Sequence, residues 1–287
     1  MAQAIKIKLD TGRYATPTAD DIKDAKQYIL NRESTAKDLK ELADGLLEDA
    51  AEKIVTICYK YNVSPGNFTI SEEYNPEMMA EIEAVMDELE EAILELMDEH
   101  AAKATDNEQH KALIIAWIAT LGRGNRNLKD TLETYMAKFL KDIEAAVAAL
   151  RFMGASQSEA ITKIKTYLHH IYDMPEVRTA IRNRNNILAT FIRLGGVWQG
   201  AVGLSNNGST NITRMLEITL QMAWMREQAL DFQEKGAAGY YQLRGSTYNC
   251  DACDEAVGFH EGTEDIMQAP LVHPHCCCYR IPIYFNN

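Results

Sequence analysis

Hydrophobic residues recur every three or four positions from Thr18 to about Leu194, which is the spacing of amphipathic helices. One apolar stripe follows Asn75-Pro76 and comprises Met79, Ile82, Met86, Leu89, Ile93 and Met97. Another comprises Leu128, Leu132, Tyr135, Phe139, Ile143, Val147 and Leu150. The alternation that is typical of strands is nearly absent from this part of the chain. We therefore expect a mainly helical body.

Local signals indicate where these helices begin and end. Starts are expected at Thr18, Thr35, Pro76, Asp106, Ser156 and Pro175, and ends at Gly122, Gly154 and Gly195. Thr18 and Thr35 would begin two separate helices, a short one and a longer one that carries Cys58 in its core face. The predicted connections are short, so neighbouring helices should pack antiparallel, as in a bundle.

The composition changes to Gly, Asn and Ser between Gly195 and Gly208, which indicates a hinge. We therefore divide the chain into a helical body over 1–195, a glycine-rich hinge over 196–208 and a C-terminal region over 209–287. That last region should begin with one more helix, from about Ser209 to Gln233. It should end in a short strand that includes Arg280 to Tyr284.

Five of the six cysteines lie close together near the C-terminus, between Cys250 and Cys278. Two close groups of ligands on separate turns suit a tetrahedral ion, and thiolate with imidazole favours zinc. The candidate ligands are Cys250, Cys253, His273, Cys276 and Cys278. Four are needed, so the set is either the four cysteines or one in which His273 replaces a cysteine. Cys277 should point away from the ion.

Disulfides or free thiols are the alternative interpretation of this cluster. The chain begins without a signal-peptide pattern, so we expect it to stay in the cytoplasm, where disulfides are rare. Four protein ligands would leave no coordination position for water, which predicts one structural Zn²⁺ per chain rather than a catalytic ion. The expected fold class is mainly α: a bundle-like helical body with a small C-terminal zinc-binding α+β module.

The terminal pattern resembles the end of phage Mu F-like head morphogenesis proteins, which are minor head proteins. In that family a Cys pair precedes a His-Pro-x-Cys-Arg-Cys segment; here the second part reads His273-Pro274-His275-Cys276-Cys277-Cys278, with Cys277 where arginine is usual. Upstream, this chain also resembles the helix that leads into the family signature, at Arg214 and Glu217 followed by Tyr240, Tyr241 and Arg244. The resemblance covers residues 207–287. It implies a role in capsid assembly and DNA packaging, with phage portal or capsid proteins as partners.

The formal net charge of −13 bears on what the protein binds. Acidic residues are dense between Glu81 and Glu99, a stretch without Lys or Arg, and such a surface repels phosphates and attracts basic proteins. It is also what a solvated helix face looks like. Free nucleic acid is therefore not expected as a partner. The one basic cluster comprises Arg178, Arg182, Arg184 and Arg193, and it is either a solvated face or a contact with an acidic protein or packaged DNA.

These observations favour a phage or prophage minor head protein that is not an enzyme, found in the bacterial cytoplasm and then in the procapsid or virion. No membrane association is expected, because the longest apolar stretch, Leu113 to Leu121, is too short to span a bilayer. One alternative is a toxin or effector, since Mu F-like domains occur joined to toxin domains. The other is a zinc-dependent nucleic-acid-binding protein, which the acidic C-terminal region opposes.

Overall fold

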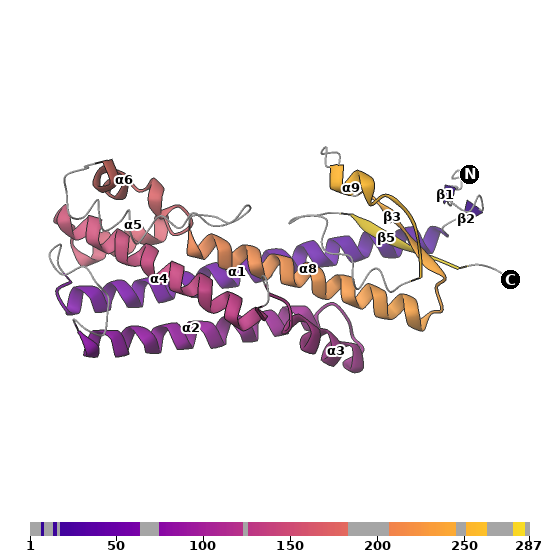
Figure 1. The fold of residues 1–287 in the computed structure, drawn as a ribbon, viewed down its shortest axis with the longest axis horizontal. Coiled ribbons are helices and arrows are strands. Elements are labelled where there is room, and N and C mark those ends of the chain that lie inside the picture. The colour runs from indigo at the N-terminus through magenta and orange to yellow at the C-terminus, as the bar shows by residue number, and fades with distance from the viewer. Residues whose placement is uncertain are drawn as a thin grey trace. The chain divides into compact units, whose positions relative to one another are not determined.

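The computed structural model describes residues 7–8, 14–15, 18–63, 75–122, 126–182, 207–244, 251–262 and 278–284. The protein is mainly helical and carries a small antiparallel three-stranded sheet near its C-terminus, as Figure 1 shows. The prediction of a mainly helical fold is therefore confirmed. No helix in the described ranges combines the length and the apolar character needed to cross a membrane.

The elements follow one another along the chain in a simple order. The helices are α1 (Ala19–Lys60), α2 (Pro76–Ala102), α3 (Glu108–Ile118), α4 (Leu128–Phe152), α5 (Gln157–Thr166), α6 (Pro175–Arg182), α8 (Gly208–Glu234) and α9 (Asp251–Glu255), with a 3-10 turn η1 (Ile171–Asp173). The strands are β1 (Ile7–Lys8), β2 (Tyr14–Ala15), β3 (Gly239–Leu243), β4 (Gly258–Glu261) and β5 (Tyr279–Ile283). β1 and β2 pair antiparallel as a short ribbon.

The chain divides into two compact units. Unit 1 comprises Met1–Leu39, Met97–Thr120 and Leu216–Asn287, and unit 2 comprises Lys40–Leu96 and Leu121–Met215. Helices α1, α2 and α8 each contribute residues to both units. The hinge predicted over 196–208 lies almost wholly outside the described residues, so the division into body, hinge and C-terminal region stays a prediction.

Unit 2 is built on antiparallel helices. Ion pairs join Lys53 to Glu88 at 2.8 Å and Lys60 to Glu81 at 2.5 Å. The residue later in α1 thus pairs with the residue earlier in α2, as in antiparallel helices. The predicted helix start at Ser156 is confirmed. The structure shows a capping box there: the Ser156 side chain accepts a hydrogen bond from the Glu159 amide, and the Glu159 side chain accepts one from the Ser156 amide. The starts at Pro76 and Pro175 and the end of α4 before Gly154 are also confirmed.

Two predicted helix starts are wrong. Thr35 does not begin a helix, because α1 runs unbroken from Ala19 to Lys60 and the Thr35 hydroxyl donates to the Asn31 carbonyl one turn earlier, at 2.9 Å. The hydroxyl is thereby satisfied within the helix and has no capping role. The cap of α3 is Asn107 rather than Asp106; its side chain accepts from two backbone amides of the first turn.

Unit 1 contains the three-stranded sheet, in the order β4-β3-β5 with both pairings antiparallel. Helix α8 leads directly into β3 through Gly236, whose φ of 68° is the left-handed conformation that glycine adopts without strain. The amides of Gly236 and Ala237 donate to the carbonyls of Gln233 and Phe232, which closes the helix as a Schellman motif. Tyr240 of β3 then packs on the end of α8.

The first turn of α8 is held in unit 2 by a buried polar cluster. Asp142 of α4 is 2% exposed, and its carboxylate accepts the Gly208 amide at 2.7 Å and the Tyr172 hydroxyl at 2.7 Å. The Lys138 ammonium contacts both Asp142 and Tyr172. Burial raises the pKa of Asp142 and lowers that of Lys138, and each charge opposes the effect on the other. A buried carboxylate at a helix N-terminus is stabilised by the amides that point at it.

Gly208 lies so close to α4 that a side chain there would collide with the backbone. An added Cβ would lie 2.3 Å from the Phe139 amide nitrogen. We expect Gly208→Ala to lower the free energy of unfolding by roughly 1–3 kcal/mol, because α8 must move away from α4. Urea denaturation measures the change.

Gly45→Ala is the matched control. Gly45 is an exposed residue in the middle of α1 with nothing within 4 Å of an added Cβ. The same substitution should here stabilise the protein by about 0.5–1 kcal/mol, since alanine is the better helix former. A Gly208→Ala protein as stable as the wild type would contradict the close contact with α4.

Candidate functional site

The predicted zinc ligands fall partly within the described residues. Cys253 is buried on α9, at 1% exposure, and Cys278 directly precedes β5. Cys250, His273 and Cys276 lie outside the described residues. Within the described ranges, no group of three or more His, Cys, Asp or Glu side chains could hold a metal. The zinc site therefore stays a prediction.

Cys253 and Cys278 belong to segments that adjoin one small sheet. β3 pairs with β4, which follows α9, and with β5, which follows Cys278. An ion pair from Arg244 to Asp254 connects the end of β3 to α9, next to Cys253. The two described candidates thus come from segments far apart in sequence that share one structural unit.

A cavity of about 240 Å³ lies elsewhere in unit 1. It is lined by the first turns of α1, the last turns of α8 and the strand β5 with the residue after it. Four carboxylates line it, together with one ammonium and one guanidinium: Asp21, Asp24, Glu227, Asp231, Lys235 and Arg280. Its apolar and aromatic lining is Ala25, Tyr28, Phe232, Pro282 and Tyr284. The cavity therefore combines acidic and aromatic groups.

Several charges that line this cavity are already engaged within the protein. The Lys235 ammonium bonds Asp231 at 2.8 Å, one turn earlier on α8. Asp21 accepts the Thr18 amide and hydroxyl as part of the cap of α1. The Arg280 guanidinium stacks over the Tyr240 ring at 5.6 Å. The predicted C-terminal strand is confirmed, because β5 spans Tyr279–Ile283. This strand places Arg280 in the cavity wall.

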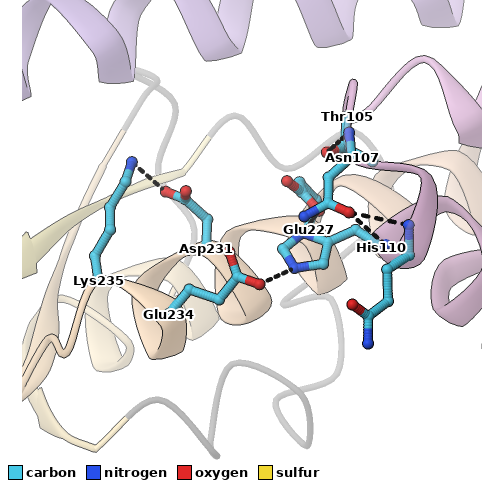
Figure 2. Close-up of polar contacts among 8 residues, drawn as sticks. Thr105, Asn107, His110, Glu227, Asp231, Glu234 and Lys235 are labelled. Atoms are coloured by element: carbon cyan, nitrogen blue, oxygen red, sulfur yellow. Dashed lines mark hydrogen bonds and ion pairs between the residues drawn. The ribbon is translucent and has the colours of Figure 1, made fainter.

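Glu227 connects the cavity to a buried histidine, shown in Figure 2. His110 of α3 is 4% exposed; its Nδ1 lies 2.9 Å from Glu227 and its Nε2 lies 2.9 Å from Glu234, both on α8. An ionised carboxylate can accept a hydrogen bond but cannot donate one. Both carboxylates therefore accept a hydrogen bond from His110 when both of its ring nitrogens carry protons. The geometry therefore suits the imidazolium form, which joins α3 to α8.

The electrostatics agree with that protonation state. Burial lowers the pKa of His110, but the hydrogen bond with Glu234 and the charge of Glu227 outweigh it, so the pKa is raised above its ordinary 6.5. Burial also raises the pKa of Glu227, against the opposing effects of its bonds with Thr105 and His110. The Glu227 carboxylate in the cavity wall is therefore paired with the His110 imidazolium.

Sequence reasoning found neither the cavity nor the histidine contact. The residues that form them come from three segments, around 21–28, 227–235 and 280–284, and from His110, and none of these stands out locally. The basic cluster found in the sequence is described only in part. Arg178 forms an ion pair with Asp173 at 2.6 Å, while Arg184 and Arg193 lie outside the described residues.

Comparisons of the chain with protein-family models, with curated proteins and with solved structures found no match.

The His110 contact predicts a stability that depends on pH. Because the folded-state pKa is raised, the contact should stabilise fully below pH 6.5 and fade as the pH rises through the folded-state pKa. The melting temperature of the wild type should exceed that of His110→Gln at pH 6, and the difference should shrink by pH 9. His170→Gln, at an exposed histidine, should show no such trend. A difference that stays constant with pH would rule out the imidazolium form.

Proposed function

We propose that this chain is a phage or prophage minor head protein that acts in head assembly and DNA packaging, with a zinc-stabilised C-terminal module. The observation that carries the proposal is the terminal pattern itself: the Cys250-x2-Cys253 pair followed by His273-Pro274-His275-Cys276-Cys277-Cys278. This pattern resembles the signature of Mu F-like head proteins. Its residues are also the ones that a tetrahedral zinc ion requires.

The arrangement of the C-terminal sheet supports this proposal. Cys253 lies on the helix between β3 and β4, and Cys278 lies at the start of β5, so an ion that joined them would join both edges of a sheet whose centre is β3. Small modules with few apolar residues commonly depend on such a metal for folding. The role we assign to the zinc is structural, and the role we assign to the protein is assembly rather than catalysis.

The partners we propose are portal or capsid proteins, met in the bacterial cytoplasm and then in the procapsid or virion. The net charge of −13 supports a protein partner with a basic surface. It also supports weak or absent binding to free nucleic acid, because a negative protein repels the phosphate backbone.

The zinc proposal predicts about one equivalent of zinc per chain in protein prepared without chelators. Zinc contributes on the order of 10 kcal/mol or more to the folding of small Cys/His modules at neutral pH. Cys253→Ser should therefore lose the zinc and make the terminal region sensitive to protease, while the helical far-ultraviolet circular dichroism signal remains. Elemental analysis and limited proteolysis measure both effects.

Cys277→Ser is the control for that substitution, since Cys277 is predicted not to bind the ion. It should retain zinc and protease resistance. Less than about half an equivalent of zinc in the wild type, or disulfides linking these cysteines, would mean that the cluster is not the structural zinc site typical of such modules.

The assembly proposal predicts that the purified protein retains portal or capsid protein of the same phage in a pull-down. It also predicts no appreciable binding of duplex DNA at physiological salt in a filter-binding assay. Tight DNA binding that weakens with salt, and that Arg182→Ala reduces, would instead favour a nucleic-acid-binding protein and assign the basic cluster a function.

A further inference from the structure

We infer that the side chains of Gln242 and Arg280 donate hydrogen bonds to zinc-bound thiolates of the C-terminal module, and so act as positioning residues for the metal. The inference rests on the zinc site of the proposed function. It goes beyond that site, because neither residue belongs to the Cys and His pattern from which the ligands were predicted.

Both side chains are buried donors without an acceptor. Gln242 is 3% exposed and Arg280 is 6% exposed. The Gln242 Nε2 and the Arg280 Nε are inaccessible to solvent and have no hydrogen-bond partner among the described residues. They therefore face the protein interior and not the cavity that Arg280 also lines. Arg280 forms no ion pair with any described carboxylate, and its guanidinium lies over the Tyr240 ring.

Such groups require an acceptor. A buried donor without one costs its desolvation energy, and a buried cation without an anion costs more. One of these donors is neutral and the other is charged, so an anionic acceptor that takes several hydrogen bonds would satisfy both.

The pairing of the strands places the two donors side by side. Gln242 of β3 lies directly opposite Arg280 of β5. Opposite residues of antiparallel strands point to the same face of a sheet, and so do residues two apart in one strand. Ring contacts confirm this arrangement, since Tyr240 stacks on His260 at 4.7 Å and Arg280 lies over Tyr240. Tyr240, Gln242 and Arg280 therefore share one face of the sheet.

Cys278 belongs to the same face. It lies two residues before Arg280, so the alternation of β5 places both on one side of the strand. Two residues of a strand span roughly 7 Å, a distance that an arginine side chain can cover. The Arg280 guanidinium can therefore reach a sulfur at position 278.

Helix α9 brings Cys253 to this face as well. Arg244, which directly follows β3, forms an ion pair with Asp254 of α9. The His260 Nε2 lies 3.0 Å from the carbonyl oxygen of Ala256, the residue after α9. Cys253 precedes Asp254 and is 1% exposed. The helix that carries this cysteine is thus held against the sheet face that carries the two donors.

Zinc ligation would create the acceptor that these donors lack. A thiol is a weak acceptor, but zinc binds cysteine as the negatively charged thiolate. Three or four thiolates outweigh the charge of one Zn²⁺, so a site of the predicted composition is net negative. Hydrogen bonds from neighbouring N–H groups stabilise and orient such ligands. A neutral amide donor and a guanidinium suit this role.

Zinc affinity, measured on the full-length protein by competition with a chelating indicator, tests the inference. Gln242→Met and Arg280→Met remove the donors and keep side chains of similar length. Each should weaken zinc binding by about tenfold or more, the usual effect of removing a group that bonds a metal ligand. Arg280→Lys retains a cation with N–H donors and should keep most of the affinity. Gln233→Met, at an exposed glutamine of α8, should leave it unchanged.

The absorption spectrum of the cobalt-substituted protein separates bonding to sulfur from general support of the sheet. A hydrogen bond lowers the energy of a sulfur lone pair. Its removal should therefore move the sulfur-to-cobalt charge-transfer band to longer wavelength in both Met variants. A substitution that only loosened the module would reduce the intensity of the band without moving it. Arg280→Lys and Gln233→Met should keep the wild-type band.

The other outcomes would overturn the inference. Wild-type zinc affinity in both Met variants would do so and leave the zinc proposal intact. Weaker zinc binding with an unmoved cobalt band would mean that the two residues only support the sheet. A wild-type protein that binds neither metal would overturn the zinc proposal together with the inference.

Far-ultraviolet circular dichroism shows whether the variants fold. If the Met variants do not, Gln242→Glu takes their place, because it keeps the shape of the side chain and replaces the amide donor with a carboxylate. It should weaken zinc binding at least as much as Gln242→Met, since a carboxylate repels thiolates. Wild-type affinity in this variant would equally overturn the inference.

Discussion

Helix α8 is buried along almost its whole length, and much of the structure depends on how its polar groups are satisfied. Between Asn207 and Phe232 only Arg214 is exposed. The helix nevertheless carries many polar side chains, and the buried ones are Ser209, Asn211, Thr213, Thr219, Gln221 and Gln228. A buried polar group without a partner costs about 1–3 kcal/mol, so each partner that the surroundings supply stabilises this helix.

Charged groups hold the two ends of α8. In unit 2 the first turn is bonded to Asp142, and the Ser209 hydroxyl donates to the Leu168 carbonyl at 2.7 Å. In unit 1 the last turns bind His110 through Glu227 and Glu234. Charged hydrogen bonds are stronger than neutral ones and are demanding in geometry. They therefore fix the position of α8 relative to α4 in one unit and to α3 in the other.

The C-terminal end of α8 supports both the sheet next to the predicted zinc ligands and the cavity. The Schellman motif at Gly236 turns the chain directly into β3, and Tyr240 packs on the helix that precedes it. The strands on either side of β3 follow the segments that carry Cys253 and Cys278. The same end of α8 lines the acidic cavity. The predicted zinc module and the cavity therefore share one supporting helix.

The parts of this structure that sequence could predict are those set by local chemistry. Ser156, Pro76 and Pro175 each favour a helix start through groups within one helical turn, and these three starts were predicted correctly. The unbroken α1 was not, because the Thr35 hydroxyl has two local choices and only the folded chain decides between a cap and a bond to Asn31. The Asp142 cluster, the His110 contact and the cavity join residues far apart in sequence, and no local pattern marks them.

Hydrogen exchange of the full-length protein, measured with zinc bound and again after chelation, tests most directly whether α8 is the fixed frame on which a zinc-dependent module is built. The account predicts that the amides of α8 exchange among the slowest in both states, because both ends of the helix are held without the metal. It also predicts that residues 251–262 lose their protection after chelation. Fast exchange throughout α8, or an unchanged pattern in residues 251–262 after the zinc is removed, would contradict it.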